Sequence, residues 1–276
     1  MRDSSRVRTQ FQCNICDFEN ETYLDELTRE TPTCASCGST VRMRSIIQTL
    51  TAELFGKSMT ISEITPPRPD IVGIGMSCWD GYAIPLAHRI AFKNTFYHQE
   101  PRLDIMNIDQ AACGSLDFIV STDVFEHVAS PVHTAFVNAR RLLKADGVFI
   151  FTVPYFYPGE ERVVTTENFN DLHDYTVFET DLGLLLKNIR KSGEIQYFHN
   201  LIFHGGPGET LEMRRFSEWS VLENLKNAGF NDISIYRNDN PQYGVYWPLL
   251  HSAPIAARVK PNSSHQNSGA LRYRII

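Results

Sequence analysis

Hydrophobic and polar positions alternate along the middle of the chain in a pattern typical of successive strands and helices. Short apolar runs predict buried strands at 70–75, 94–99, 116–123, 148–155, 232–237 and near 254–259. Amphipathic stretches predict helices at 45–56, 79–91 (after Pro85), 131–147 and 217–230. The alternation predicts an α/β fold with a doubly wound, mainly parallel sheet.

Residues at the ends of two of these stretches suit helix boundaries. Ser45 can cap the helix at 45–56, and Gly56 ends it. Pro131 lies at the start of the helix at 131–147, and Gly147 stops it. Because ligands bind at the carboxyl ends of the strands in open α/β sheets, we expect the chemistry just after each strand.

Four cysteines near the N-terminus form two pairs, Cys13–Cys16 and Cys34–Cys37, with 17 residues between the pairs. Two such pairs can place four thiolates around one tetrahedral ion, which predicts a zinc ribbon. Four protein ligands leave no open position, so we expect the zinc to be structural. The predicted division is a ribbon at 1–44, a large domain at 45–258 and a flexible tail at 259–276.

Composition and charge narrow the class of protein. The 276 residues are 42% hydrophobic and 21% charged, and the net charge is −6, which favours a soluble protein and argues against a nucleic-acid partner gripped through phosphates. No apolar leader or long apolar run is present, so we expect a cytoplasmic protein without a membrane span. The oligomeric state stays open between monomer and dimer.

The segment LDFIVSTDVFEHVASPVHTAFVNARRLLKADGVFIFTVPY (116–155) resembles the second half of the class I S-adenosylmethionine-dependent methyltransferase core. The resemblance covers roughly 66–258, and its most specific parts are the Glu-His-Val turn and LLKADG. It implies a Rossmann-like methyltransferase sheet and S-adenosylmethionine as cofactor. A cysteine cluster ahead of such a core also resembles sugar C-methyltransferases and certain ribosomal RNA guanine methyltransferases.

The resemblance assigns the first cofactor-binding loop to IVGIGMSCW. Gly73 occupies the position where the family has an acidic residue. Gly75 matches the first loop glycine, and Ser77 replaces the second. Glycines here let the backbone approach the methionine part of the cofactor.

The remaining cofactor contacts are compressed into a short stretch. Only three residues separate Glu100 from Asp104, so one strand-helix unit of the family core is expected to be deleted. Glu100 is the candidate for the ribose hydroxyls, and Asp104 with Ile105 for the adenine ring. Asp123, after the strand at 116–123, is expected to shape the cofactor pocket or orient a partner.

Three histidines are candidate catalytic residues, because methyl transfer to a hydroxyl needs a base near neutral pH. His127 follows the strand at 116–123, where it can serve catalysis, substrate contact or a structural cap. His173 (with Tyr175) and His204 can face the same cleft or belong to ordinary polar loops.

Three arginines, Arg42, Arg44 and Arg214, can hold an anionic substrate or simply be solvated. The main hypothesis is an enzyme that methylates a small molecule or glycan at oxygen. One alternative is an RNA methyltransferase whose ribbon docks the backbone with Arg42 and Arg44. Another is a non-catalytic binding protein with a methyltransferase fold, which the altered first loop keeps open.

Overall fold

The computed structural model describes residues 6–156, 164–169, 171–181, 183–204, 210–249, 252–259 and 272–276. Its centre is a seven-stranded sheet in the order β17-β15-β16-β6-β5-β3-β4. The strand bounds are β3 (Arg68–Met76), β4 (Ile90–Thr95), β5 (Leu116–Thr122), β6 (Leu143–Thr152), β15 (Asp232–Ile235), β16 (Ile255–Arg258) and β17 (Arg272–Ile275). β3 to β6 are parallel, and β16 is antiparallel to both β6 and β15.

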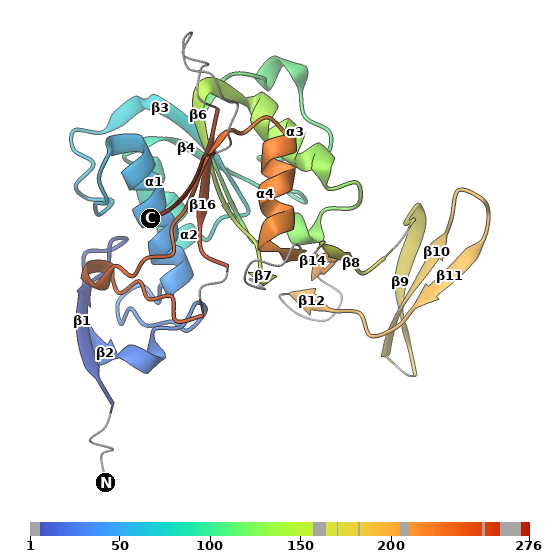
Figure 1. Ribbon diagram of the computed structural model, residues 1–276, viewed down its shortest axis with the longest axis horizontal. Coiled ribbons are helices and arrows are strands. Elements are labelled where there is room, and N and C mark those ends of the chain that lie inside the picture. Colours follow the sequence, from blue (N-terminus) through green and yellow to red (C-terminus); the bar gives the residue numbers. More distant parts are fainter. Residues whose placement is uncertain are drawn as a thin grey trace.

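Helices cover both faces of this sheet (Figure 1). On one face lie α1 (Val41–Phe55) and α2 (Asp80–Ala87), and on the other α3 (His133–Leu142) and α4 (Glu218–Asn227). The predicted doubly wound α/β class is therefore confirmed. Aromatic side chains fill the layer under α3, where Phe136 packs edge to face on Phe125 with ring centroids 4.8 Å apart.

The predicted deletion of one strand-helix unit is also confirmed. Residues 96–115 are all described, and the only helix or strand among them is the 3-10 turn η2 (Gln110–Ala112). β4 is consequently the edge of the sheet, and the segment that follows it runs directly to β5.

Several predicted boundaries were wrong. β4 covers 90–95 rather than 94–99, because Ile90 and Phe92 are the buried positions that pair with β3. α2 begins at Asp80, so Pro85 lies inside the helix and removes one backbone hydrogen bond without ending it. α3 ends at Leu142, and residues 143–147 enter β6 through an irregularity in its pairing with β5.

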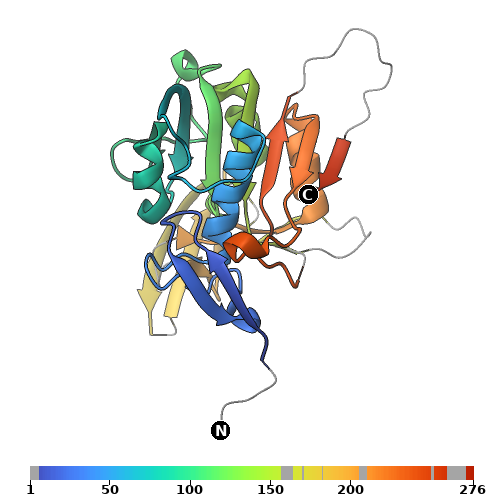
Figure 2. The ribbon, with the colours of Figure 1, turned by 90° about the vertical axis from the view of Figure 1, so that its left-hand side faces the viewer.

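The N-terminal part is a small hairpin of β1 (Arg8–Gln12) and β2 (Glu19–Tyr23), followed by η1 (Leu24–Glu26). It packs below the sheet (Figure 2), and its Phe11, Cys13 and Leu27 belong to the same buried cluster as the sheet. The expected boundary between residues 44 and 45 falls inside α1. Thr40 caps this helix by accepting from the Met43 N–H, whereas the expected cap, Ser45, lies within it.

A long insertion separates β6 from α4. Its strands are β7 (Tyr155–Phe156), β8 (Thr166–Glu167), β9 (Asp174–Thr180), β10 (Gly183–Ile189), β11 (Ile195–Phe198), β12 (Phe203–His204), β13 (Thr210–Leu211) and β14 (Arg214–Ser217). β9, β10 and β11 form an antiparallel sheet that projects from the body of the molecule (Figure 1). We call this sheet the arm. It shares a small buried cluster, separate from the main core, with Phe169, Leu211 and Met213.

Of the expected flexible tail, residues 260–271 lie outside the described part of the chain. β17, near the end of the chain, pairs in parallel with β15, and the Ile276 N–H donates to the Ile235 carbonyl. This pairing gives partners to backbone groups at that edge of the sheet. Within the described part of the chain, no helix has the length and apolar character needed to cross a membrane.

Candidate functional site

A cavity of about 680 Å³ opens at the carboxyl ends of β3, β4 and β5. Its lining comes from the segments 76–77, 95–98, 103–106 and 123–129, from Tyr175 and Val177 of the arm, and from residues 203, 204, 210, 211 and 213. A volume of this size suits a small-molecule site, and its place in the sheet is the one expected of α/β folds.

The cavity brings together most of the residues predicted from the sequence. Those that line it are Ser77, Asp104, Ile105, Asp123, His127 and His204. Asp104 and Ile105 are held by their neighbours, since an Asp104 oxygen accepts from the Met106 N–H at 2.9 Å and the Ile105 carbonyl accepts from the Asn138 side chain at 2.8 Å.

Gly73 and Gly75 do not line the cavity, although both are required for packing. A Cβ on Gly73 would lie 2.2 Å from the Phe118 ring, and one on Gly75 would lie 2.6 Å from the Cys78 sulfur. The absence of side chains at these positions therefore makes room for the interior of the sheet.

Glu100 and His173 also lie outside the cavity lining. Both are exposed. A Glu100 oxygen accepts from the Arg102 N–H, and the His173 backbone N–H donates to Asn188. Neither residue is among those that line the cavity.

Ser77 adopts the backbone conformation that its position requires. Its φ is +50°, in the left-handed region that favours glycine. Its N–H donates to the Thr95 carbonyl at 2.7 Å, and the next N–H, of Cys78, donates to the Asn94 side chain at 2.9 Å. The loop after β3 thus keeps a glycine-like turn despite the serine.

His127 lies in η3 (Phe125–His127), directly after β5. Its Nδ1 is 2.8 Å from the Leu211 carbonyl. Because a carbonyl only accepts, Nδ1 carries the proton, and Nε2 of the neutral ring has a free lone pair. Burial, with a smaller contribution from His204, lowers the pKa of His127 below its ordinary value. His127 is therefore neutral at pH 7 and able to accept a proton.

His204 lies beside it, with the two ring centroids 5.0 Å apart. The Nε2 of His204 is 3.1 Å from a Glu212 oxygen. His204 therefore lies beside a carboxylate, whereas His127 lies beside a backbone carbonyl, so the two histidines differ in environment.

Glu126 is a functional candidate that sequence reasoning missed. Its side chain is 1% exposed, and neither carboxyl oxygen has a hydrogen-bond partner among the described residues. Burial, and next the nearby Asp123, raise its pKa well above the ordinary value. The nearest oxygen lies 3.6 Å from His127 Nε2. Its position in the Glu-His-Val turn was the available signal.

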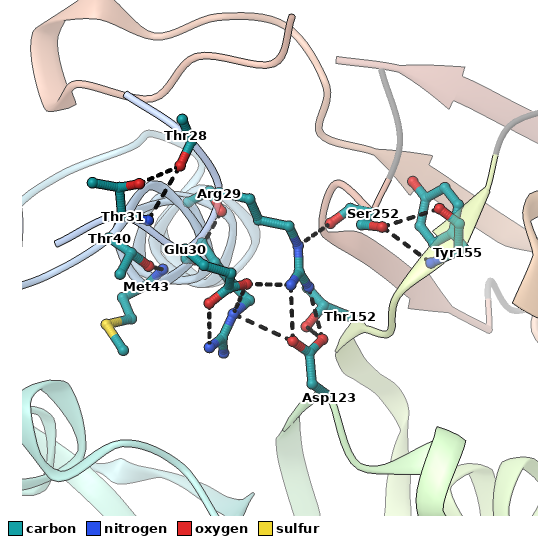
Figure 3. Close-up of polar contacts among 12 residues, drawn as sticks. Thr28, Arg29, Glu30, Thr31, Thr40, Met43, Asp123, Thr152, Tyr155 and Ser252 are labelled. Atoms are coloured by element: carbon teal, nitrogen blue, oxygen red, sulfur yellow. Dashed lines mark hydrogen bonds and ion pairs between the residues drawn. The ribbon is translucent and has the colours of Figure 1, made fainter. Parts of the chain in front are cut away.

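Asp123 is the centre of an ionic network that reaches the N-terminal part of the chain (Figure 3). Arg29 donates to both carboxylate oxygens, at 2.9 and 2.7 Å, and Thr152 donates at 3.0 Å. The Nε of Arg42 is 3.3 Å from the same carboxylate. Burial raises the pKa of Asp123, but Arg29 and Arg42 outweigh it and hold the pKa below its ordinary value.

The three arginines suggested for an anionic ligand are engaged elsewhere. Arg42 pairs with Glu30 and Asp123. Arg214 is fully buried and donates to Glu167 and to the Phe125 and Val128 carbonyls, which fixes the loop that carries His127. Arg44 is also fully buried, so neither Arg44 nor Arg42 presents a free guanidinium to RNA.

The four cysteine sulfurs all lie within 4.8 Å of one another. Two of the separations are 3.7 Å (Cys13 to Cys37) and 3.6 Å (Cys16 to Cys34). A tetrahedral zinc with bonds of about 2.3 Å requires sulfurs about 3.8 Å apart, so the cluster fits this ion. Burial raises the pKa of Cys34, but hydrogen bonds from the Cys37 and Ser36 backbone outweigh it and bring the pKa to about 6.

Arg44 lies beside this cluster. It donates to the Tyr243 and Gly244 carbonyls at 2.8 and 2.9 Å, near η4 (Pro241–Tyr243), and to the Ser39 carbonyl at 2.7 Å. Its guanidinium is 4.4 Å from the Phe11 ring centroid. Burial lowers its pKa to about 10, so it stays charged at pH 7. A buried cation here would offset the net negative charge of four thiolates around a divalent ion.

Comparison with protein families gives one match. Residues 85–151 match the family model described as a methyltransferase domain. The predicted class of enzyme is therefore supported by the sequence pattern of the segment that contains β4, β5, α3 and most of β6. A comparison with curated proteins finds no match.

Solved structures give remote likenesses. A Burkholderia thailandensis 1,6-didemethyltoxoflavin N1-methyltransferase is 17% identical, with 79% of this chain and 78% of that chain covered and a TM-score of 0.43. An S-adenosylmethionine-dependent methyltransferase from Clostridium acetobutylicum is 13% identical, with 81% and 93% covered and a TM-score of 0.43. A sugar N-methyltransferase from a Streptoalloteichus species is 12% identical, with 78% and 88% covered and a TM-score of 0.42.

Proposed function

We propose that this protein is an S-adenosylmethionine-dependent methyltransferase that acts at oxygen on a small molecule or glycan. The observation that carries the proposal is the neutral His127, which lines a cavity at the carboxyl end of β5 within the part of the chain that matches the methyltransferase domain. The volume of the cavity, about 680 Å³, favours a small acceptor or a single sugar unit over a folded macromolecule.

The residues present fit the cofactor. Ser77, in its left-handed turn, leaves the backbone at the end of β3 open to the methionine part. Asp104 and Ile105 offer a carboxylate and an apolar face to the adenine. When bound, S-adenosylmethionine supplies an electrophilic methyl group on its sulfonium.

His127 removes the acceptor proton. The cofactor would supply the methyl group to the acceptor oxygen, with its sulfur as the leaving group. The hydroxyl proton would pass to His127 Nε2, and the ring would then hold a positive charge. The hydrogen bond from Nδ1 to the Leu211 carbonyl keeps the ring in the tautomer that this step needs.

The four cysteines would hold a structural zinc. Four thiolates fill a tetrahedral shell, so no ligand position is left for a substrate. The ion would stabilise the N-terminal hairpin and the segment up to α1 rather than take part in methyl transfer.

The test is calorimetric binding of S-adenosylmethionine and S-adenosylhomocysteine, followed by a screen for S-adenosylhomocysteine formation with hydroxylated small molecules and sugars. Asp104→Ala is expected to weaken cofactor binding by roughly tenfold. His127→Ala is expected to keep binding but to lower kcat by about 10²–10⁴-fold. His173→Ala, at an exposed position outside the cavity, is the matched control and should match the wild type.

The pH profile gives a second test. Methyl transfer needs neutral His127, whose pKa lies below the ordinary 6.5. The rate should therefore rise with pH, with the midpoint of the rise below pH 6.5. A folded, zinc-loaded protein that binds neither cofactor form would refute the proposed function, and unchanged turnover in His127→Ala would refute the role of the base.

A further inference from the structure

We propose that the N-terminal cysteine unit (residues 6–44) is a structural part of the cofactor pocket, and that Arg29 and Arg42 are positioning residues which act through Asp123. The inference rests on the proposed function for the identity of the ligand. It goes beyond that function because it gives the cysteine unit a role in shaping the cavity through Asp123, although none of the unit's own residues lines it.

The contact between Arg29 and Asp123 is a strong one. Arg29 binds Asp123 with two parallel hydrogen bonds, at 2.9 and 2.7 Å, which is the strongest geometry for this pair. The side chains of Arg29, Arg42 and Asp123 are 17–19% exposed. Because water has little access to the three groups, the attraction is screened less than in a surface ion pair.

Asp123 forms the turn between β5 and the wall of the cavity that carries His127. It follows β5 immediately and has a φ of +53°, a conformation that is unfavourable for residues other than glycine and more tolerable for aspartate. This turn directs the segment 124–129, which forms one wall of the cavity and carries His127. A carboxylate held from one side by two arginines and by Thr152 keeps the turn in place.

The Asp123 carboxylate is already engaged, so Asp123 shapes the pocket through the turn rather than by binding a ligand. Both of its oxygens already accept from Arg29, one also accepts from Thr152, and the other lies close to Arg42. These four contacts occupy the acceptor directions of the group. An additional ligand hydrogen bond would have to displace one of them.

The two arginines lie at the ends of the segment that carries the second cysteine pair. Arg29 lies between the two cysteine pairs and Arg42 lies five residues after Cys37. The Arg42 N–H donates to the Arg29 carbonyl at 3.1 Å, which closes this segment into a loop. The loop contains Cys34 and Cys37, so an ion held by the four thiolates would also restrain the segment that carries both guanidiniums.

Arg29 also makes a second contact with the central fold. Its Nε lies 3.3 Å from the Ser252 carbonyl, and the Ser252 side chain exchanges hydrogen bonds with the Tyr155 backbone (Figure 3). The same side chain therefore joins the cysteine unit to β5 and to the segments beyond β6 and before β16.

The experiment compares Arg29→Gln with Arg8→Gln. Arg8 lies in the β1–β2 hairpin of the same cysteine unit, but its ion pair with Glu21 is exposed and lies outside the loop between Arg29 and Arg42. The measurements are zinc content, hydrogen-deuterium exchange of residues 121–129, and the Kd for S-adenosylhomocysteine. In Arg29→Gln we expect full zinc content, faster exchange in that segment and a Kd raised by roughly tenfold. Arg8→Gln should match the wild type.

Two further experiments test whether Arg29, Asp123 and the metal act on the same segment. Adding Arg29→Gln to Asp123→Asn should cause little further change in exchange or Kd, because each substitution removes the same contact between Arg29 and Asp123. Zinc removal from the wild type with a chelator should accelerate exchange in the same segment. Should Arg29→Gln fail to fold, Arg29→Lys, which keeps the charge without the paired geometry, takes its place and is expected to give a smaller change of the same sign.

Unchanged exchange at 121–129 in the Arg29 variant, with full zinc content, would overturn the inference. The exchange measurement needs no cofactor. If the wild type binds no S-adenosylhomocysteine, the proposed function fails while the exchange result still decides whether the cysteine unit positions the turn.

Discussion

Two parts of the molecule reach the cavity region from outside the central fold, and they are built differently. The cysteine unit shares the main buried core, and its Arg44 is fully buried against the loop at Tyr243 and Gly244. The arm has only a small cluster of its own, and its outer face exposes Phe178, Ile195 and Tyr197 at 39–55%.

This difference indicates a division of roles. A unit anchored by buried contacts can hold a cavity wall in one fixed geometry. A pocket for a cofactor that many enzymes share requires such a fixed wall. The arm contributes Tyr175 and Val177 to the cavity from a sheet that projects from the body. Elements with few contacts to the core tolerate sequence change, so the arm is suited to contact the acceptor.

The largest effect is expected from the cysteine cluster. Cys34→Ser removes one of four thiolates, and zinc binding in such sites supplies about 10–16 kcal/mol of folding free energy. We expect loss of the metal, measured by elemental analysis, and unfolding of the N-terminal unit. Cys113→Ser, at a half-buried thiol outside the cluster, is the control. A zinc-loaded Cys34→Ser protein of wild-type stability would contradict the assignment.

The next effect tests the anchor of the same unit. Arg44→Met leaves the Ser39, Tyr243 and Gly244 carbonyls without their donor, and we expect a loss on the order of 3 kcal/mol in the free energy of unfolding. Urea unfolding measures it. Arg8→Met, at an exposed ion pair, should leave the curve unchanged. Equal midpoints for the two variants would show that the unit is not anchored through Arg44.

A smaller effect is expected at Glu126, in the turn that the cysteine unit is proposed to hold. Its raised pKa means that the folded state keeps a proton which the unfolded state releases above about pH 4.5. Wild-type stability should therefore fall as pH rises above 4.5, whereas Glu126→Gln should lack this loss and be the more stable protein at pH 8, by on the order of 1 kcal/mol.

Urea midpoints at pH 5 and pH 8 check this expectation. Glu179→Gln, at an exposed position of the arm, should keep the wild-type pH dependence. Identical pH slopes in the wild type and Glu126→Gln would mean that the buried carboxyl is ionised when folded.

The smallest effect concerns the arm. Tyr175→Ala should raise the KM for the acceptor several-fold, about 1 kcal/mol, and leave the Kd for S-adenosylhomocysteine unchanged. Tyr197→Ala, on the outer face, should change neither value. A weakened cofactor Kd in Tyr175→Ala would instead place the arm on the cofactor side of the cavity.

Local pattern was sufficient for much of the fold. Apolar runs and helix signals identified the strands and helices of the central sheet, and the three residues between Glu100 and Asp104 revealed the deleted unit. Cysteine spacing predicted the cluster that the fold assembles, and the position of His127 after β5 placed it at the cavity. These features depend on neighbours in sequence, whose periodicity and spacing can be counted directly.

Other features were decided by tertiary structure alone. Arg29 meets Asp123 across 94 positions, and Arg44 meets Tyr243 across 199. Glu126 is unusual because folding buries it without a hydrogen-bond partner among the described residues, and a side chain at Gly73 would meet the Phe118 ring. Burial and pairing arise from segments brought together by folding, and no local pattern records which charged residue will meet which. For that reason the sequence alone predicted the elements and the cluster, whereas the support of the turn at Asp123 required the assembled chain.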